Sequence, residues 1–332
     1  MNILHIVNSW AVGGIQEQVY LICKYMKQHN HFVAGFANPK FPFYDKFVST
    51  GATLLHSNPL YTHIDEWSQK YIIDVVHKQT GGADYPYYVD YCYENVIPVV
   101  ETLHCPRKSR LPINRVRNIV YTTDYTLQQN DKEHAEIMVP IQYSLDIDRI
   151  FSRRQESEKI IIGRLCRIIP EKRWDLVVQL VDRLNAKMKS KIEFVFAGSQ
   201  ADSEYGKNIV SSLTKHDNVK FIGYLEDKYD LYKQIDICFN PVWETSFDIV
   251  FLEAMACGVP IITNNNSAAP YVVQKAGIVC GDNIDDMVIN TELLALDKDA
   301  RLLLGLAGHS LIQSEYDRET NLKLLSELYE SY

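Results

Sequence analysis

The chain of 332 residues lacks several features that mark specialised classes of protein. It has no excess of basic charge, since 34 Lys and Arg residues stand against 42 Asp and Glu residues. The resulting net charge of −8 argues against a dedicated nucleic-acid binder, which carries a strongly basic domain. Its apolar runs are short, and none approaches the roughly 18 residues that a membrane span needs. The sequence therefore predicts neither a nucleic-acid partner nor a transmembrane helix.

Disulfide frameworks, zinc motifs and a secretory leader are also missing. The cysteines are odd in number, widely scattered and never arranged as a C-x-x-C pair. The first residues, MNILHIVN, show no charged leader region and read as a buried strand. We therefore expect a cytoplasmic protein with reduced thiols, which act as small core residues: Cys23, Cys92, Cys105, Cys166, Cys238, Cys257 and Cys280.

The chain does contain a regular alternation of short apolar runs and longer segments of helical period. This alternation is typical of a doubly wound parallel sheet. In the second half we expect strands at residues 159–163, 191–198, 218–223, 236–240, 259–263 and 277–280. In the first half we expect strands at residues 2–7, 32–36, 72–76, 96–103, 118–122 and 137–140. The Tyr-rich and Gly-rich stretch 80–95 is expected to be mostly loop.

The length suggests two domains, because a domain usually has about 100–200 residues. The charged run 152–159 separates the two alternating halves and is the natural linker. We expect an α/β fold with one Rossmann-like domain over residues 1–150 and a second over 158–315, facing each other across a cleft. A final helix over 316–332 has an apolar side that suits either domain, and we expect it to pack back on the first.

Two segments of the second half gather polar residues at predicted strand ends. IIGRLCRIIPEKRWDL places Arg164, Arg167, Lys172 and Arg173 around the start of a helix, as either a phosphate site or a solvated basic turn. NPVWETSFDIVFLEAMACGVPIIT places Glu253 inside an otherwise apolar helix over 249–257. Because an unpaired carboxylate is costly to bury, we expect Glu253 to face a ligand or a cleft.

Taken in order, these two segments and five others resemble the retaining nucleotide-sugar glycosyltransferases with the GT-B fold, family four in the usual classification. The series runs MNILHIVNSWAVGGIQEQV, PVVETLHCP, IMVPIQYSLDIDRIF, GRLCRIIPEK, FVFAGS, VKFIGYL and FDIVFLEAMACGVPIIT. The resemblance extends through much of the chain. It implies donor binding by the second domain and an acceptor side formed by the first.

The resemblance assigns roles to individual residues. It implies that Arg167 and Lys172 are the cations on the donor phosphates, with Arg164 as a second candidate for the arginine. Glu253 matches a glutamate that accepts hydrogen bonds from the ribose hydroxyls. A second glutamate is expected eight positions earlier, where this chain has Thr245. Either Glu244 takes the role of this second glutamate, or the contact with the donor sugar is altered.

Further donor contacts are implied at Gly13, Gly14, Tyr224, Leu225, Phe247, Asp248, Ile249 and Val250. Asp248 stands where the family has a glycine, while the amides of Ile249 and Val250 near a helix N-terminus suit phosphate oxygens. His104 matches a histidine next to the sugar, and the alternative is a satisfied core or loop histidine.

Two charged segments have more than one interpretation. DID at residues 146–148 imitates the metal motif of a different transferase architecture, but its place at the end of the first domain favours a structural role, and we predict no catalytic metal. The segment 105–118 is either a solvated loop or a surface for an anionic acceptor or lipid headgroups. Its five cations have no acid among them: Arg107, Lys108, Arg110, Arg115 and Arg117.

The resemblance thus implies a retaining, metal-independent transferase without a cofactor. The expected donor is a UDP or GDP sugar, and the expected acceptor is a sugar, a lipid-linked molecule or another hydroxyl. Peripheral contact at the inner face of a membrane follows only from the lipid interpretation of the basic segment 105–118, not from the resemblance. Two alternatives stay open. A sugar-nucleotide epimerase of the same fold needs acid and base groups around the sugar. A non-catalytic sugar-nucleotide-binding relative is suggested by Thr245 and Asp248.

Overall fold

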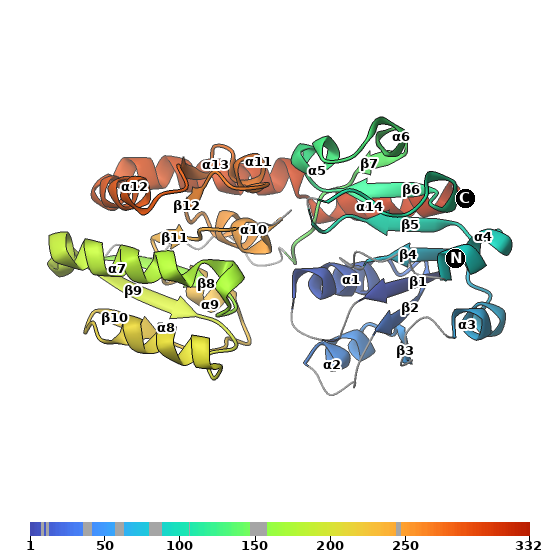
Figure 1. The fold of residues 1–332 in the computed structure, drawn as a ribbon, viewed down its shortest axis with the longest axis horizontal. Helices are drawn as coiled ribbons and strands as arrows, with labels where there is room; N and C mark the ends of the chain where they lie inside the picture. Colours follow the sequence, from blue (N-terminus) through green and yellow to red (C-terminus); the bar gives the residue numbers. More distant parts are fainter. Residues whose placement is uncertain are drawn as a thin grey trace. The chain divides into compact units, whose positions relative to one another are not determined.

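The structure is a computed structural model that describes residues 1–7, 10, 13–35, 42–56, 63–79, 88–105, 107–146, 158–243 and 247–332. The chain forms two compact units (Figure 1). The first unit comprises Met1–Asp146 together with Tyr316–Tyr332, and the second comprises Ile147–Glu315. In the described parts of the chain, no helix is long and apolar enough to cross a membrane.

The first unit is built on a parallel sheet with the strand order β3-β2-β1-β4-β5-β6-β7. Its central strand β1 pairs with β2 on one side and with β4 on the other. Residues 3–7 are apolar except for His5. All five are buried, as a strand covered on both faces requires. The strands are β1 (Asn2–Val7), β2 (Asn30–Gly35), β3 (Thr53–His56), β4 (Val75–Lys78), β5 (Val99–Thr102), β6 (Asn118–Tyr121) and β7 (Met138–Pro140).

Helices cover both faces of this sheet. Apolar residues of α1 and α14, such as Ile22 and Leu325, pack with Ile3 and Val100 against one face. Residues of α3 and α4 pack against the other face. The helices are α1 (Gly14–Tyr25), α2 (Pro42–Ser49), α3 (Ile64–Tyr71), α4 (Tyr88–Glu94), α5 (Asp124–Gln128), α6 (Lys132–Ala135) and α14 (Arg318–Glu330), with the 3-10 helix η1 (Ile113–Arg115).

The first unit contains two elements that the sequence did not predict. Strand β3 was not predicted, because two of its four residues are exposed and only Leu55 is fully buried, as suits the edge of a sheet. The segment 88–94 was expected to be loop but forms α4. There, Tyr88, Val89 and Cys92 are buried on one side of the helix and join the core. Residues 80–87 of the same stretch lie outside the described residues.

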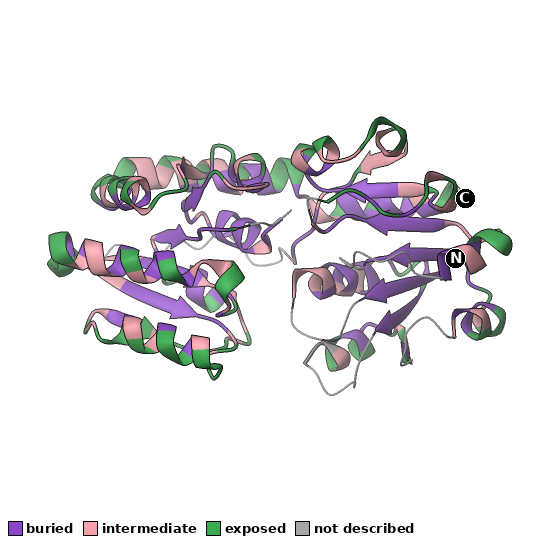
Figure 2. Ribbon diagram, in the orientation of Figure 1, coloured by how far each residue is buried: buried purple, intermediate pink, exposed green. Residues whose placement is uncertain are grey.

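The second unit contains a parallel sheet with the order β10-β9-β8-β11-β12-β13. All six strands expected in this half of the chain are present, and together with the first sheet they confirm the predicted α/β class. The strands are β8 (Ile160–Leu165), β9 (Ile192–Ala197), β10 (Val219–Phe221), β11 (Ile237–Phe239), β12 (Ile261–Asn264) and β13 (Gly277–Cys280). Figure 2 shows the central strands of both units as mainly buried.

Helices also flank the second sheet. Trp174, Val177, Val181 and Leu184 recur at three- and four-residue steps along α7 and pack on Phe194 and other strand residues. The helices are α7 (Trp174–Met188), α8 (Glu204–Thr214), α9 (Tyr229–Tyr232), α10 (Ile249–Ala256), α11 (Ala269–Val273), α12 (Ile284–Leu296) and α13 (Lys298–Glu315). Two 3-10 helices, η2 (Pro170–Lys172) and η3 (Lys189–Lys191), flank α7. The cysteines of both units are free thiols, six of them buried.

Candidate functional site

The carboxyl ends of β8 and β11 meet the start of α10 in the second unit, and this junction holds a cluster of polar side chains. Lys172 Nζ, at the end of η2, lies 3.0 Å from Asp248 Oδ2. Asn240 Nδ2 donates to the same carboxylate oxygen at 3.3 Å. Strand ends of an open parallel sheet are where such folds bind ligands, and helix N-termini there favour anions.

The pair of Lys172 and Asp248 is ionised. Burial raises the pKa of the Asp248 carboxyl, but the nearby charge of Lys172 and the hydrogen bonds outweigh it, so the pKa is lowered. Burial likewise lowers the pKa of Lys172, and the charge of Asp248 more than reverses this effect. The site therefore holds a cation that is already partnered by an internal anion.

Arg164 holds the loops around this pair from inside the unit. Its guanidinium donates to the backbone carbonyls of Lys172 and Pro241 and to Asn240 Oδ1. It lies 4.9 Å from the centre of the Trp174 ring and has no exposed surface. Its remaining nitrogen, Nη1, is buried without a hydrogen-bond partner among the described residues. The Arg164 side chain thus fixes the backbone at Lys172 and Pro241 and the side chain of Asn240.

Arg167 stands in a different environment from Arg164. Its neighbours Cys166 and Ile168 are buried, whereas the side chain of Arg167 is exposed. Its carbonyl accepts a hydrogen bond from Trp174 Nε1 at 2.8 Å, which fixes the backbone beside the start of α7. The sequence left the choice between the two arginines open, and only Arg167 presents its charge to solvent.

Glu253 is buried inside α10 and has partners in the same unit. Tyr232 donates its hydroxyl to Glu253 Oε2 at 2.8 Å, and Lys228 Nζ lies 2.7 Å from Oε1. Burial and the charge of Glu253 raise the pKa of Tyr232 well above its ordinary value. The expectation that Glu253 turns away from the core was not met. The sequence did not predict these partners, which are the hydroxyl of Tyr232 in α9 and the ammonium group of Lys228, the residue before α9.

The other donor residues implied by the resemblance fall in both units. Phe247 and Val250 are buried, and Ile249 begins α10. Tyr224 is exposed and follows Gly223, whose φ of +73° suits a glycine. Leu225 is half-buried. Gly13 is the N-cap of α1 and Gly14 its first residue. Glu244 and Thr245 lie outside the described residues.

His104 follows β5 in the first unit and is buried with both ring nitrogens bonded. Nε2 is 2.8 Å from Gln79 Oε1, and Nδ1 bonds the hydroxyl of Tyr143. Burial and the nearby charge of Lys78 lower the pKa of His104 to about 3. This geometry favours the satisfied core histidine over a proton carrier, because the ring stays neutral at neutral pH.

Sequence reasoning missed a buried polar network that continues from His104. Gln79 Nε2 lies 3.1 Å from His77 Nδ1, and His77 Nε2 lies 2.7 Å from Thr102 Oγ1. Tyr329 of α14 bonds to His77 from the other end of the chain. A small cavity of about 40 Å³ lies beside these side chains. Histidines on neighbouring strands were the available signal, but their adjacency depends on sheet order.

The basic segment 105–118 runs over the surface of the first unit. Arg107, Lys108, Arg110 and Arg117 are exposed. Arg115 Nε instead lies 2.9 Å from Asp90 Oδ1, and its guanidinium stacks 3.6 Å from the centre of the Tyr93 ring. Thus not all five cations have the same environment, a distinction that the sequence did not reveal.

Asp146, the first residue of the DID motif, anchors the end of the first unit. It accepts from Lys24 Nζ at 2.7 Å and from Arg318 Nη1 at 3.2 Å, and it also bonds to Tyr25. Asp148 lies outside the described residues. The described position thus serves a structural role.

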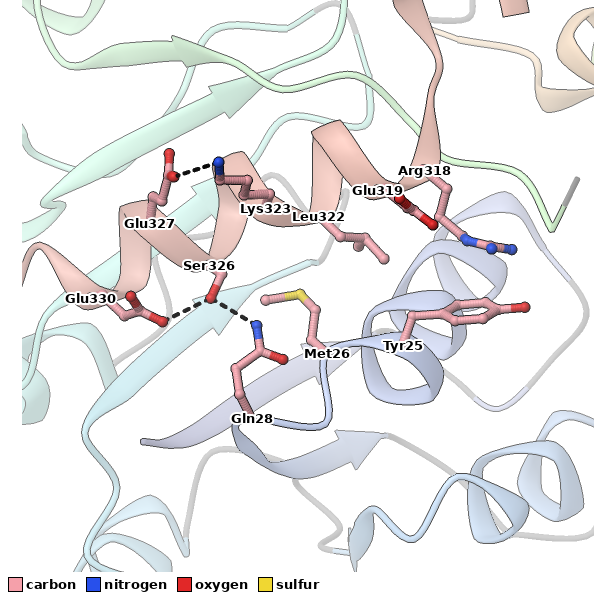
Figure 3. A pocket seen from close by; sticks show the side chains of 10 residues that line it. All are labelled: Tyr25, Met26, Gln28, Arg318, Glu319, Leu322, Lys323, Ser326, Glu327 and Glu330. Carbon is pink, nitrogen blue, oxygen red and sulfur yellow. Dashed lines mark hydrogen bonds and ion pairs between the residues drawn. The ribbon is translucent and has the colours of Figure 1, made fainter. Parts of the chain in front are cut away.

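A cavity of about 480 Å³ lies between α1 and α14 (Figure 3). Both cations on its wall are paired, Arg318 with Asp146 and Lys323 with Glu327. Gln28, Ser326 and Glu330 form a hydrogen-bonded row, drawn as dashed lines. This lining lacks the clustered cations expected of a phosphate site.

Among the described residues, His5, Cys23 and His31 form a buried group with the spacing of metal ligands. His5 Nε2 and His31 Nδ1 are already 3.1 Å apart in a hydrogen bond, and His31 Nε2 bonds the carbonyl of Met26. These contacts satisfy both ring nitrogens of His31 and Nε2 of His5, while His5 Nδ1 is buried without a hydrogen-bond partner among the described residues.

The comparison with known families now bears on the second unit. Residues 146–304 match the family described as glycosyl transferases group 1. This segment belongs to that family. The group 1 segment contains the cluster around Lys172, Asp248 and Glu253, so the polar junction lies inside the recognised region.

Relatives and solved structures extend the comparison. The O-antigen biosynthesis glycosyltransferase WclY of Escherichia coli is 25% identical over 174 residues, which are 52% of this chain and 46% of that protein. The chain thus spans about half the length of the curated relatives it matches. Anabaena Alr3699/HepE in complex with UDP has a TM-score of 0.82 at 16% identity and covers 100% of both chains. A Rickettsia africae glycosyltransferase has a TM-score of 0.83 at 15% identity, over 99% of this chain and 98% of that one.

These likenesses confirm the fold expected from the sequence. The chain has the GT-B fold, with two Rossmann-like α/β units.

Proposed function

We propose that this protein is a retaining glycosyltransferase that moves a sugar from a nucleoside diphosphate donor to a hydroxyl of an acceptor. The observation that carries the proposal is the cation Lys172 of η2, whose ammonium group lies beside Asp248 at the start of α10 within the group 1 segment. A structural neighbour in complex with UDP supports a nucleotide sugar as donor. UDP and GDP are both candidate donor nucleotides.

The proposed reaction needs stabilisation of a departing diphosphate. Lys172 and the exposed Arg167 supply fixed positive charge, and the first amides of α10, at Ile249 and Val250, supply N–H dipoles. The bond between the anomeric carbon and the phosphate oxygen breaks, and the bond to the acceptor oxygen forms on the same face. The leaving phosphate takes the acceptor proton. No side-chain base and no metal ion are needed in this scheme.

The remaining assignments complete the proposal. Glu253, whose oxygens are bonded to Tyr232 and Lys228, must release one of these partners to accept a hydrogen bond from the donor ribose. Tyr224 and Leu225 lie near the base. In the first unit, Gly13 and Gly14 leave room for the donor. His104, whose ring nitrogens bond Gln79 and Tyr143, acts by holding these two side chains in place and not by direct contact with the sugar. In this proposal the exposed cations of the segment 105–118 serve as the acceptor-side surface, and with a lipid acceptor the reaction takes place at the cytoplasmic face of a membrane.

The first test replaces Lys172 by Ala and Glu253 by Gln. We expect Lys172→Ala to lower turnover by about 10²–10³-fold, because it removes a charge that acts on the leaving group. Glu253→Gln should lower turnover and also weaken donor binding. Release of nucleotide from UDP and GDP sugars, with a panel of acceptors, measures both effects. Lys215→Ala is the matched control, since Lys215 is exposed and pairs with Asp182 elsewhere in the unit.

Three results separate the alternatives. Full activity of both variants would contradict the assignment. Conversion of the donor sugar without an acceptor indicates the epimerase, and nucleotide binding without turnover indicates the non-catalytic relative. An inverted anomeric centre in the product, seen by NMR, would exclude retention while leaving the fold intact.

A further inference from the structure

Asp248 occupies the position at the start of α10 where a helix usually carries a capping side chain. Aspartate is among the residues most favoured there, because its carboxylate accepts from the free amides of the first turn. In this protein the side chain of Asp248 makes no capping hydrogen bond. It turns instead to Lys172 at 3.0 Å and Asn240 at 3.3 Å. Its charge is therefore directed at the cation of the proposed donor site.

The contact between Lys172 and Asp248 is built into a buried scaffold. Asn240 is fully buried and links Arg164, which donates to its Oδ1, with Asp248, which accepts from its Nδ2. Arg164 Nη2 also donates a hydrogen bond to the backbone carbonyl of Lys172 and so fixes the backbone there. The side chain of Asp248 is 7% exposed, whereas that of Lys172 is 19% exposed. A ligand can thus reach the ammonium group of Lys172, while the carboxylate of Asp248 lies deeper in the unit.

We propose that Asp248 is a built-in competitor of the donor diphosphate for Lys172. This inference rests on the proposed function and deepens it. In the empty site the carboxylate neutralises Lys172. A bound diphosphate brings negative charge to the same ammonium group and is repelled by Asp248, so Lys172 must be shared or the carboxylate must move. The nucleotide then binds more weakly than the cations alone would allow, and the nucleoside diphosphate product leaves more readily.

Calorimetric titration of UDP and of GDP into the full chain tests this competition. We expect Asp248→Asn to bind one of these nucleotides at least about fivefold more tightly than the wild type, a common size for coupling between sites. Lys172→Ala should bind more weakly. Asp182→Asn makes the same chemical change in the same unit, at a carboxylate that pairs with Lys215 and His216, and should leave the Kd unchanged.

The double variant Lys172→Ala/Asp248→Asn shows whether the effect acts through the lysine. The tightening should vanish in this background, and tightening that persists would overturn the proposal. Asp248→Asn leaves Lys172 without its partner and can reduce stability, so Asp248→Ser is the second variant, because Ser is a favoured N-cap. Circular dichroism checks that each variant is folded.

The failure of the competition differs from the failure of the proposed function. Folded Asp248 variants that bind no more tightly than the wild type, with binding still weakened by Lys172→Ala, overturn the competition and leave the donor site in place. Binding that is insensitive to Lys172→Ala overturns both, because Lys172 then lies outside the nucleotide site.

Discussion

At the scale of single residues, Arg164 and Arg167 show how one short sequence yields two different roles. Both arginines belong to the short segment GRLCR and stand three positions apart. Arg164 lies within β8 and is enclosed by the carbonyls of Lys172 and Pro241. Arg167 follows the strand and is exposed. A buried guanidinium stays in place because its donors satisfy carbonyls that would otherwise lack partners.

Arg164→Ala should therefore reduce stability strongly. The change removes three hydrogen bonds and the contact with Trp174, and it leaves buried acceptors unpaired. We expect the free energy of unfolding of the second unit to fall by about 3 kcal/mol or more. Hydrogen exchange of the β8 and β9 amides in urea measures it. Arg183→Ala, at a largely exposed pair with Asp285, should cost less than about 1 kcal/mol. Equal losses in the two variants would contradict this reasoning.

At the scale of elements, the segment 105–118 combines an anchored centre with exposed cations. Ser109 Oγ donates to Glu101 Oε2, while Glu101 itself forms a buried pair with Lys78 of β4. Ser109 N also donates to Asn130 Oδ1 at 2.9 Å. These contacts hold the middle of the segment against the unit and leave Arg107 and Lys108 facing solvent.

If this segment meets an anionic lipid surface, its exposed and paired cations should contribute differently. Replacing Arg107 and Lys108 by Gln should weaken sedimentation with phosphatidylserine vesicles, by about 1 kcal/mol per residue or roughly fivefold each at low salt. Arg115→Gln should have a smaller effect, because Arg115 is already paired with Asp90. Absence of wild-type binding at low salt would exclude the lipid surface and leave a soluble anionic acceptor or a solvated loop.

At the scale of the whole molecule, both units bury an ion pair, and the first unit also buries a group of histidines. The second unit buries ionised groups beside the proposed donor site. The first unit buries several histidines on neighbouring strands: His5, His31, His77 and His104. Burial lowers the pKa of His31 to about 4 and the pKa of both His77 and His104 to about 3, and it lowers that of His5 strongly.

These lowered pKa values make the first unit sensitive to acid. The unfolded chain binds protons at its histidines near pH 6.5, whereas the folded unit does not, so acidification favours unfolding. Stability should be fully present above about pH 6.5. It should fall from about pH 6.5 down to about pH 4 for His31 and to about pH 3 for His77 and His104, by up to about 1.4 kcal/mol per pH unit for each histidine. Hydrogen exchange of β1 and β4 at pH 7, 6 and 5 measures the slope.

His104→Gln offers a control for this slope. It removes one titrating group from the network, so the loss of stability per pH unit should become smaller. A first unit whose stability is constant between pH 7 and pH 5 would show that these histidines accept protons without unfolding.

Local patterns were most reliable where a segment is apolar throughout. Buried central strands such as β1 and β9 were predicted because their runs of apolar residues are broken only by His5 and by Glu193. Strand β3 was missed because an edge strand needs little apolar sequence, and α4 was missed because its burial depends on the neighbouring strands. Lys172 and Glu253 were selected from their sequence context, but their partners were not.

The two α/β halves, the GT-B resemblance and the cations near the proposed phosphate site could all be predicted from the amino-acid sequence. These follow from short-range periodicity and from motifs in a fixed order. Only the tertiary structure decided that Asp248 pairs with Lys172, that Arg164 is enclosed and that His104 is saturated by Gln79 and Tyr143. The physical reason is that such pairings join residues distant in the chain, and the order and register of parallel strands set which side chains meet.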